Sequence, residues 1–456
     1  MFPRFRPGRL EDDAIEELLD CIHDSFGEGD FNPSIPAGYT YLGQFIDHDL
    51  TFDPTPQLAT MKQAHAAVSL RSPRFDLDSV YGAGPDDQPY LYEWTNEADR
   101  GVKLLVGSST SGDGRLTVAD LPRNDQGLAL IGDPRNDENL IVSQLHLLFI
   151  CFHNRVVDQI RSDELTGREL FHAARALVRW HYQWIVAHDF LKRIVGKTMA
   201  ESVLLPGATE TVERRFFNFT GVPFIPREFS GAAYRFGHSM VRNSYALNTT
   251  LTEAGVVDPL IFSEETDPAS ERHLVGLRPL PPRMKIEWDH FFEVSDTRPQ
   301  PSRKIDTEIA GALMRLPKDV NAKRESLPRL NLRRGRSLGL PPGRRIARAM
   351  DVPRLTRAQL RLTTAQHMTA DQAPLWWYVL CEAATELGNE GKHLGPVGGR
   401  IVAEVLVGML EGDPDSYLCR NPAWQPDDLV PGCVDFRMGD LVRFTHPPVP
   451  PDGPNP

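Results

Sequence analysis

Cysteine is scarce in this sequence of 456 residues, and there are few of the patterns that cysteine supports. The five cysteines are far apart in the chain: Cys21, Cys151, Cys381, Cys419 and Cys433. The absence of C-x-x-C pairs and zinc-finger spacings excludes a thiol redox motif and a cysteine zinc site. The N-terminus lacks the apolar core of a signal peptide, and we find no run of about 18 apolar residues. We therefore expect a reduced, cytoplasmic protein without a membrane span.

An excess of positive charge is also missing. Acidic residues number 62 against 50 basic ones, which gives a formal net charge of −12. This balance argues against non-specific nucleic-acid binding. One stretch, residues 323–348, is nevertheless rich in arginine. It is typical of a solvated surface, it lacks the aromatic residues expected of a nucleic-acid site, and it could also anchor a bound anion.

Strand patterns are few and short, whereas helical periodicity is common. Apolar residues repeat on one stripe from Glu138 to Arg161 and again from Arg168 to Val195. Thr356 suits a helix start, and Gly395-Pro396 suits a break before an apolar helix at residues 399–410. These patterns predict a mainly α fold with little β structure.

The composition shows no shift that would divide the chain into independent halves. Hydrophobic residues make up 41% of it, which is enough for a large core. We predict a single large helical domain over residues 35–445. An N-terminal segment, 1–34, precedes it, and a proline-rich tail, 446–456, follows.

The segment from Gly43 to Leu50 contains a histidine between two carboxylates. In a helix, Gln44, Asp47 and His48 share one face by their i, i+3, i+4 spacing, whereas Asp49 points about 100° further round. One turn would thus offer an acid–base group to a pocket and a carboxylate to another site. Taken alone, a helix start with satisfied polar groups is the better explanation of the segment.

A second polar cluster lies before the first long apolar stripe. Arg135, Glu138 and Asn139 share a face by the same spacing, although acids in a first helical turn are often favourable with the helix dipole alone. His146 and His153 follow within or beside an apolar run. We interpret both as buried structural histidines.

Two further segments contain a histidine and an asparagine that could pair. His238 follows Gly237, which has no side chain where a flat cofactor could approach the backbone. Asn331, in an arginine-rich segment, could accept a hydrogen bond from a neighbouring imidazole. A structural histidine and a polar loop residue are the plain alternatives.

Hard oxygen donors gather near residue 76. Asp76 and Asp78 point the same way from an extended segment, and Ser72 and backbone carbonyls add ligands of the kind that calcium prefers. A solvated aspartate turn is the alternative.

In this order, the motifs resemble those of the animal-type haem peroxidases of the peroxidase–cyclooxygenase superfamily. The resemblance spans roughly residues 35 to 411. The segments that carry it are Gly43-Gln-Phe-Ile-Asp-His-Asp49, Asp76 to Gly82, Gly132-Asp-Pro-Arg-Asn-Asp-Glu138, His153-Asn-Arg155, Phe236-Gly-His238 and Leu330-Asn-Leu-Arg-Arg-Gly-Arg336.

The resemblance implies roles for the residues on both sides of a haem b. His48 matches the distal histidine, Gln44 the distal glutamine and Arg135 the catalytic arginine. His238 matches the proximal iron ligand, and Asn331 matches the asparagine bonded to its other ring nitrogen.

Further matches concern the edges of the haem. Arg235 and Arg334 match contacts to the propionates, and Asp47 and Glu138 match the carboxylates that form ester bonds to haem in some members. Position 139 is Asn, so the sulfonium link that methionine makes in other members cannot form.

The resemblance also implies a calcium site. The matching residues are Asp49, Ser72, Arg74 (through its carbonyl), Asp76 and Asp78.

The activity implied is reduction of H2O2 through a ferryl intermediate and oxidation of small organic donors. His48 would take a proton from the peroxide and return it to the leaving oxygen, for which a pKa near ~6.5 is suitable. The haem performs the redox chemistry.

Three alternatives to a peroxidase remain at this point. A haem dioxygenase of the same superfamily would use a tyrosine three residues before the proximal histidine. That position is Arg235 here, and Tyr234 is one residue further back, so the sequence favours a peroxidase. The others are a haem-dependent oxidase of a specialised metabolite and a helical scaffold without haem.

Overall fold

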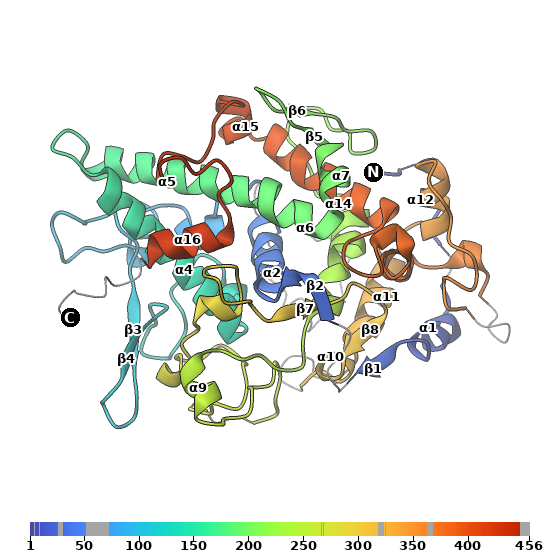
Figure 1. The fold of residues 1–456 in the computed structure, drawn as a ribbon, viewed down its shortest axis with the longest axis horizontal. Coiled ribbons are helices and arrows are strands. Elements are labelled where there is room, and N and C mark those ends of the chain that lie inside the picture. The colour runs from blue at the N-terminus through green and yellow to red at the C-terminus, as the bar shows by residue number, and fades with distance from the viewer. Residues whose placement is uncertain are drawn as a thin grey trace.

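The computed structural model describes residues 1–3, 5–8, 10–25, 31–51, 73–265, 267, 269–317, 323, 325–362 and 368–446. Helices dominate it, as predicted (Figure 1). The α-helices are α1 (Asp12–Leu19), α2 (Gly38–Leu50), α3 (Asp78–Tyr81), α4 (Leu140–Ile160), α5 (Gly167–Trp184), α6 (Leu191–Val195), α7 (Lys197–Glu201), α8 (Arg227–Gly231), α9 (Thr249–Glu253), α10 (Gly311–Met314), α11 (Leu327–Ser337), α12 (Gly343–Ala349), α13 (Leu375–Ala383), α14 (Pro396–Glu411), α15 (Tyr417–Arg420) and α16 (Met438–Thr445).

Shorter helical turns connect these helices. The 3-10 turns are η1 (Pro89–Leu91), η2 (Pro134–Asp137), η4 (Ala233–Met240), η5 (Pro282–Met284), η6 (Trp288–His290), η7 (Ala370–Gln372) and η8 (Glu386–Gly388). A π-helical turn, η3 (Ile185–Phe190), joins α5 to α6, so the stripe predicted over 168–195 forms one nearly continuous rod.

Strands within the described residues form small two-stranded sheets. The strands are β1 (His23–Ser25), β2 (Phe31–Pro36), β3 (Gly107–Thr110), β4 (Thr117–Asp120), β5 (Leu204–Leu205), β6 (Thr211–Val212), β7 (Pro301–Arg303) and β8 (Glu308–Ala310). Strand β1 pairs in parallel with β8, and the pairs β2–β7, β3–β4 and β5–β6 are antiparallel. Two of these pairs bring residues 23–36 to residues 301–310.

Helix α4 begins two residues later than the periodicity predicted. The side chain of Asn139 accepts hydrogen bonds from the backbone N–H groups of Ile141 and Val142, so it is the N-cap of the helix. Glu138 therefore belongs to the preceding turn. Helix α4 is long and apolar enough to cross a membrane, which the sequence analysis did not anticipate, but 83% of its most apolar window is buried inside the fold. That burial is the pattern of a core helix.

The prediction of a helix starting at Thr356 is wrong. The Thr356 hydroxyl accepts a hydrogen bond from Gln359 N, but residues 357–361 form turns, and Arg361 has a positive φ of 55°. The break at Gly395-Pro396 is correct, since α14 begins at Pro396.

Helix α2 lies near the middle of the molecule (Figure 1) and packs against α4. The rings of Phe45 and Phe149 stack between these helices, with centroids 4.8 Å apart. At its start, a Cβ on Gly38 would lie 2.5 Å from the ring of Phe292, so only glycine allows this close approach. The packing holds α2 firmly and leaves one of its faces directed to a pocket.

Candidate active site

One pocket brings together residues predicted from distant segments. Gln44, Asp47 and His48 of α2 line it, together with Arg235 and His238 of η4. The pocket has an empty volume of about 1200 Å3, including its open mouth. Cofactor sites are concave and mostly apolar with a few converging polar groups, and this pocket fits that description.

His48 belongs to a buried chain of hydrogen bonds that runs through Asn136 to His146. Its Nδ1 lies 2.8 Å from Oδ1 of Asn136, and Nδ2 of Asn136 lies 3.0 Å from Nδ1 of His146. An amide oxygen only accepts, so Nδ1 of His48 must carry the hydrogen. The other ring nitrogen, Nε2, then has a lone pair that can accept a proton.

The surroundings of His48 favour its neutral form. Burial, and next the positive charge of Arg135, lower the pKa of His48 to about 4. This pKa is lower than the value near ~6.5 that is suitable for an acid–base group at neutral pH. The neutral state required for proton acceptance is nevertheless the one present at neutral pH.

Arg135 lies behind His48 and is absent from the pocket lining found in the described residues. Its guanidinium donates to both carboxylate oxygens of Asp133, at 2.8 to 3.2 Å, and to the backbone oxygens of His48 (3.0 Å) and Thr51. The role of Arg135 as the catalytic arginine stays a prediction. The charge of Arg135 lowers the pKa of His48, and the carboxylate of Asp133 holds the guanidinium of Arg135 in place.

The wall beside His48 contains a second polar group. Nε2 of Gln44 donates a hydrogen bond to Glu138, and Nδ2 of Asn139 donates one to Oε1 of Gln44 at 3.2 Å. Burial raises the pKa of Glu138 to about 7, although the charge of Arg135 opposes this shift. A carboxyl group that is partly protonated near neutral pH therefore faces the pocket.

His238 is also paired with an asparagine. Nδ2 of Asn331, in α11, lies 2.9 Å from Nδ1 of His238. Burial, and next the charge of Arg235, lower the pKa of His238 to about 3, and Arg334 contributes in the same direction. The imidazole is therefore neutral, which is the form that binds a metal ion.

The residues around His238 fit a haem. A Cβ placed on Gly237 would meet no atom within 4 Å, so the backbone here borders open space. Arg235 lines the pocket, and its Nε donates to the carbonyl of Ser230 at 2.9 Å, which positions the guanidinium. Together, a neutral histidine, an open backbone edge and a nearby cation match the needs of an anionic flat cofactor.

Tyr234 occupies the same pocket as His238. Segment 233–240 is a 3-10 helix, so successive residues turn by about 120°. The hydroxyl of Tyr234 donates to the carbonyl of Gly43 in α2 at 3.3 Å. The tyrosine thus bridges the two walls of the pocket.

The residues predicted to bind calcium lie close together where they are described. Oδ2 of the buried Asp49 accepts a hydrogen bond from Leu77 N at 3.3 Å. Burial, and next the charge of Asp78, raise the pKa of Asp76 to about 7. Within the described residues, no group of three or more histidine, cysteine or acidic side chains is arranged to hold a metal ion.

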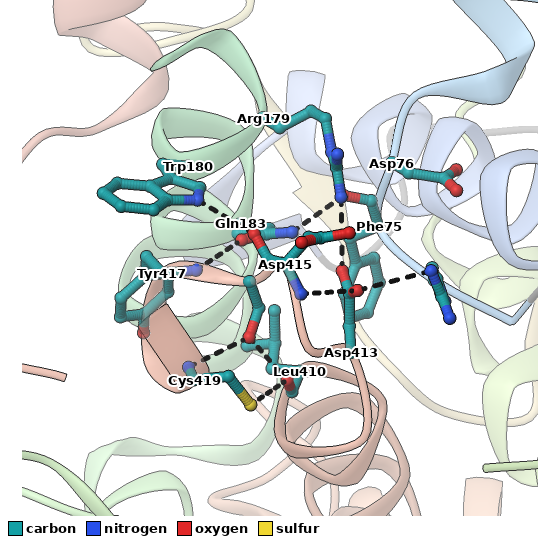
Figure 2. Close-up of polar contacts among 12 residues, drawn as sticks. Phe75, Asp76, Arg179, Trp180, Gln183, Leu410, Asp413, Asp415, Tyr417 and Cys419 are labelled. Carbon is teal, nitrogen blue, oxygen red and sulfur yellow. Dashed lines mark hydrogen bonds and ion pairs between the residues drawn. The ribbon is translucent and has the colours of Figure 1, made fainter. Parts of the chain in front are cut away.

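Ser72, also predicted as a calcium ligand, lies outside the described residues. Arg74 follows it and pairs with Asp413, with 3.7 Å between Nη1 and Oδ1. Figure 2 shows how a helix braces this segment: Nε2 of Gln183 donates to the carbonyl of Phe75 at 3.0 Å.

The same brace reaches the C-terminal part of the chain (Figure 2). Oε1 of Gln183 accepts from Tyr417 N at 3.1 Å, and Nη2 of Arg179 lies 3.3 Å from Oδ2 of the buried Asp413. Helix α5 therefore links the segment after residue 72 to the turn between α14 and α15.

Sequence reasoning missed Asn136 and Asp133 as parts of the site. Asn136 connects His48 to His146, and Asp133 holds Arg135. His146 and His153 are buried as predicted, and His153 bonds the hydroxyl of Tyr81 and the carbonyl of a neighbouring segment. The short 3-10 turn η2, which aims Asn136 at His48, does have a sequence signal: Asp133 is its N-cap and Pro134 is its first residue.

Comparison with known proteins identifies the family. The sequence profile described as animal haem peroxidase matches residues 66–372, which include Arg135, His238 and Asn331. The chain belongs to the animal haem peroxidase family. The match begins after α2, so the place of His48 in this peroxidase domain rests on the geometry described above.

Two curated relatives illustrate the likeness in sequence. The chain is 26% identical to chorion peroxidase of Drosophila melanogaster over 387 residues, covering 82% of this chain and 44% of that protein. It is 24% identical to thyroid peroxidase of Mus musculus over 378 residues, covering 74% and 37%. The chain thus spans less than half the length of these relatives.

Two solved structures illustrate the likeness in fold. Peroxidase A of Dictyostelium discoideum has a TM-score of 0.56 at 15% identity, covering 94% of this chain and 88% of that one. Fatty acid alpha-dioxygenase of Oryza sativa has a TM-score of 0.62 at 16% identity, covering 97% and 80%. These similarities confirm the mainly α fold of the superfamily.

Proposed function

We propose that the protein is a haem peroxidase that reduces H2O2 and oxidises small organic donors. The observation that carries the proposal is that His48 and His238 line one pocket, each held at Nδ1 by an asparagine. We call the group His48, Asn136 and His146 the peroxide side, and the pair His238 and Asn331 the iron side.

On the iron side, His238 would hold the haem iron through Nε2. Arg235 and Arg334 would offer positive charge to the propionates, which gives part of the arginine-rich stretch an anionic partner. When bound, the haem supplies the redox chemistry. Binding through Nε2 requires a hydrogen on Nδ1, so the amide of Asn331 must then turn its oxygen toward the ring.

On the peroxide side, His48 would move one proton. Its Nε2 accepts a proton from the first oxygen of H2O2 and returns it to the second, which leaves as water. Asn136 keeps the hydrogen on Nδ1 throughout, because its own Nδ2 is directed to His146. Arg135 limits how long the imidazolium persists, since its charge disfavours that form.

The experiment that tests the proposal follows dissolved O2 and the oxidation of one dye-forming phenol. Haem-loaded protein is given H2O2 and a small phenol, while product absorbance and dissolved O2 are recorded. We expect phenol oxidation that requires H2O2 and proceeds without O2 under argon. Oxidation that needs O2 and ignores H2O2 would contradict a peroxidase.

A dioxygenase is the second candidate, because Tyr234 lies in the pocket with His238. The Oryza sativa structural neighbour carries that activity in its name. A tyrosyl radical mechanism predicts O2 uptake with a fatty acid that Tyr234→Phe abolishes. We expect no such uptake, and we expect Tyr234→Phe to keep its H2O2-dependent phenol oxidation.

We further propose that Ca2+ binds between Asp49 and the segment of Asp76 and Asp78. The negative charge of Asp78 contributes to the raised pKa of the buried Asp76, and a divalent cation beside both carboxylates would remove this repulsion. Ser72 and the carbonyl of Arg74 would complete the site. Metal analysis of gently purified protein tests the proposal.

A covalent link is a further part of the proposed haem site. Asp47 and Glu138 both line the pocket, where a haem methyl group could meet a carboxylate. Acid–organic extraction after treatment with H2O2 tests for an ester. Haem that extracts completely would show that neither carboxylate forms the bond.

A further inference from the structure

Tyr39 lies between two pockets. It is a lining residue of the haem pocket and also of an outer pocket formed with Glu293, Asp435, Arg437 and Asp440. The side chain is otherwise buried, with 1% of its surface exposed. A tyrosine in this position connects the interior of the protein to a surface depression.

The hydroxyl of Tyr39 has a proton acceptor. It donates to Oδ2 of Asp189 at 2.6 Å, and the same oxygen accepts from Met438 N at 3.0 Å. Met438 adjoins Gly439, which lines the outer pocket together with Tyr39, so the Asp189 carboxylate joins the phenol of Tyr39 to the backbone next to that pocket. The backbone of Tyr39 belongs to the first turn of α2.

The charges around the ring favour a neutral radical over a charged one. The guanidinium of Arg193 lies 4.5 Å above the ring centroid of Tyr39, and its Nε pairs with Asp189 at 2.8 Å. A positive ring radical beneath this cation would be repelled. Loss of an electron from Tyr39 must therefore be accompanied by transfer of the phenolic proton to Asp189.

The ordinary state of Tyr39 is the protonated phenol. Burial, and next the negative charge of Asp189, raise the pKa of Tyr39 well above its usual value of 10.0. The phenol is thus kept intact until an electron is withdrawn.

We propose that Tyr39 is a second oxidation site, which carries oxidising equivalents from the haem pocket to a phenolic donor too bulky to enter it. The donor would bind in the outer pocket, beside the polar and charged side chains of Glu293, Arg437 and Arg443. The proposal rests on the proposed peroxidase function. In α2, Tyr39 precedes His48 by nine residues, a separation of about 13 Å along the helix axis.

The step balances in electrons and protons. Tyr39 would give one electron to the haem site after H2O2 has acted as oxidant there, and its proton to Asp189, which would leave a neutral tyrosyl radical. A phenol in the outer pocket then gives one electron to that radical and releases its own proton to solvent. Asp189 returns the first proton to Tyr39, so the phenol and the carboxylate are both restored.

The first test maps the radical directly. Haem-loaded protein is mixed with H2O2 and a nitroso spin trap in the absence of any donor, and the adduct is located by peptide mass spectrometry. We expect the adduct on Tyr39, and we expect Tyr92→Phe, which alters a buried tyrosine elsewhere, to leave it there. An adduct confined to other residues would overturn the proposal. Because the adduct is mapped in the wild-type protein, this result does not depend on whether a variant folds.

The second test compares two donors, a free phenol and the same phenol coupled to dextran. In Tyr39→Phe, the rate with the dextran phenol relative to the free phenol should fall by about tenfold or more. Asp189→Asn, which keeps the ring and removes the proton acceptor, should lower the same ratio. An unchanged ratio in both variants would overturn the proposal. If wild-type protein oxidises neither phenol with H2O2, the peroxidase function itself is wrong.

Discussion

The peroxide side and the iron side each pair a histidine with an asparagine, but the two asparagines face their histidines with opposite ends of the amide group. On the peroxide side, the amide oxygen of Asn136 faces Nδ1 of His48; on the iron side, the amide nitrogen of Asn331 faces Nδ1 of His238. Asn136 is held at both ends, since its nitrogen contacts His146. The first histidine is therefore locked in one tautomer, whereas the second depends on the orientation of one amide group.

This difference suits the two proposed tasks. A group that moves a proton must return to the same tautomer after every cycle, so a lock from a second histidine is useful. A metal ligand is fixed by the metal itself, because iron at Nε2 leaves the hydrogen on Nδ1 and turns the asparagine to accept it. The two sides can be separated by experiment.

The largest effect should come from the iron side. We expect His238→Ala to lose the Soret band and nearly all bound haem, because His238 is the proposed ligand. Haem content per protein, measured after reconstitution, gives the result. His172→Ala, which alters an exposed histidine, is the control. Retention of the wild-type Soret band by His238→Ala would show that another residue binds the iron.

On the peroxide side, His48→Ala should keep its haem and lose activity. A general acid–base group contributes about 10²–10⁴-fold, and the reaction with H2O2 should slow by a factor in that range. Stopped-flow absorbance measures this rate directly. An equal loss of haem in His48→Ala would mean that the two sides do not act separately.

The two asparagines should differ in what they affect. Removing a residue that orients a ligand costs about 10–100-fold in activity or metal affinity. We expect Asn136→Leu to slow the H2O2 reaction without shifting the haem spectrum, and Asn331→Leu to weaken haem binding and shift the spectrum. Haem titration and stopped-flow measurements on both variants decide it. If both variants changed haem affinity, the haem spectrum and the H2O2 reaction rate in the same way, the two sides would not have separate roles.

Calcium removal should affect the peroxide side more than the iron side, because Asp49 adjoins His48 in α2. A ligand at a hundredfold excess over its Kd stabilises a protein by about 2.7 kcal/mol, so chelation should lower Tm measurably. Asp78→Asn should reproduce the effect, whereas Asp13→Asn, at an exposed acid, should not. An unchanged Tm on chelation would contradict the calcium site.

The smallest effect concerns pH. The pKa of His48 is about 4, lowered by burial and by Arg135, so the imidazole is neutral above that pH and protonated below it. The value of kcat/KM for H2O2 should therefore rise with pH through about 4 and then level off. A rise centred near the ordinary histidine value of about 6.5 would indicate that water reaches His48 freely.

Local patterns were sufficient to predict much of the fold. The bounds of α4 were predicted to within two residues, because its apolar residues repeat with the helical period. The break before the last long apolar helix was predicted at the correct proline, although α14 begins at Pro396 and the predicted helix began at Gly399. The turn at Thr356 was mistaken for a helix start, since a threonine hydroxyl can accept a backbone hydrogen bond three residues later both in a turn and at a helix N-terminus. Burial of His146 and His153 also followed from their apolar neighbours.

For the site itself, the residues were predicted better than their arrangement. Motif order selected Gln44, Asp47, His48 and His238, and the structure brings these residues to one pocket. Arg135 was predicted as the catalytic arginine, and its guanidinium pairs with Asp133 and donates to the backbone oxygen of His48. Spacing along a helix cannot reveal such a pairing when the segment is a short 3-10 turn.

What the sequence alone determined is therefore the residue types, their order and the helices that carry them, because these depend on contacts within a few residues of the chain. Only the tertiary structure decided which side chains meet. The pairs His48 with Asn136 and Tyr39 with Asp189 join residues separated by 88 and 150 positions. Such pairs form when buried polar groups must find partners in a packed interior, and that requirement is met by the whole fold.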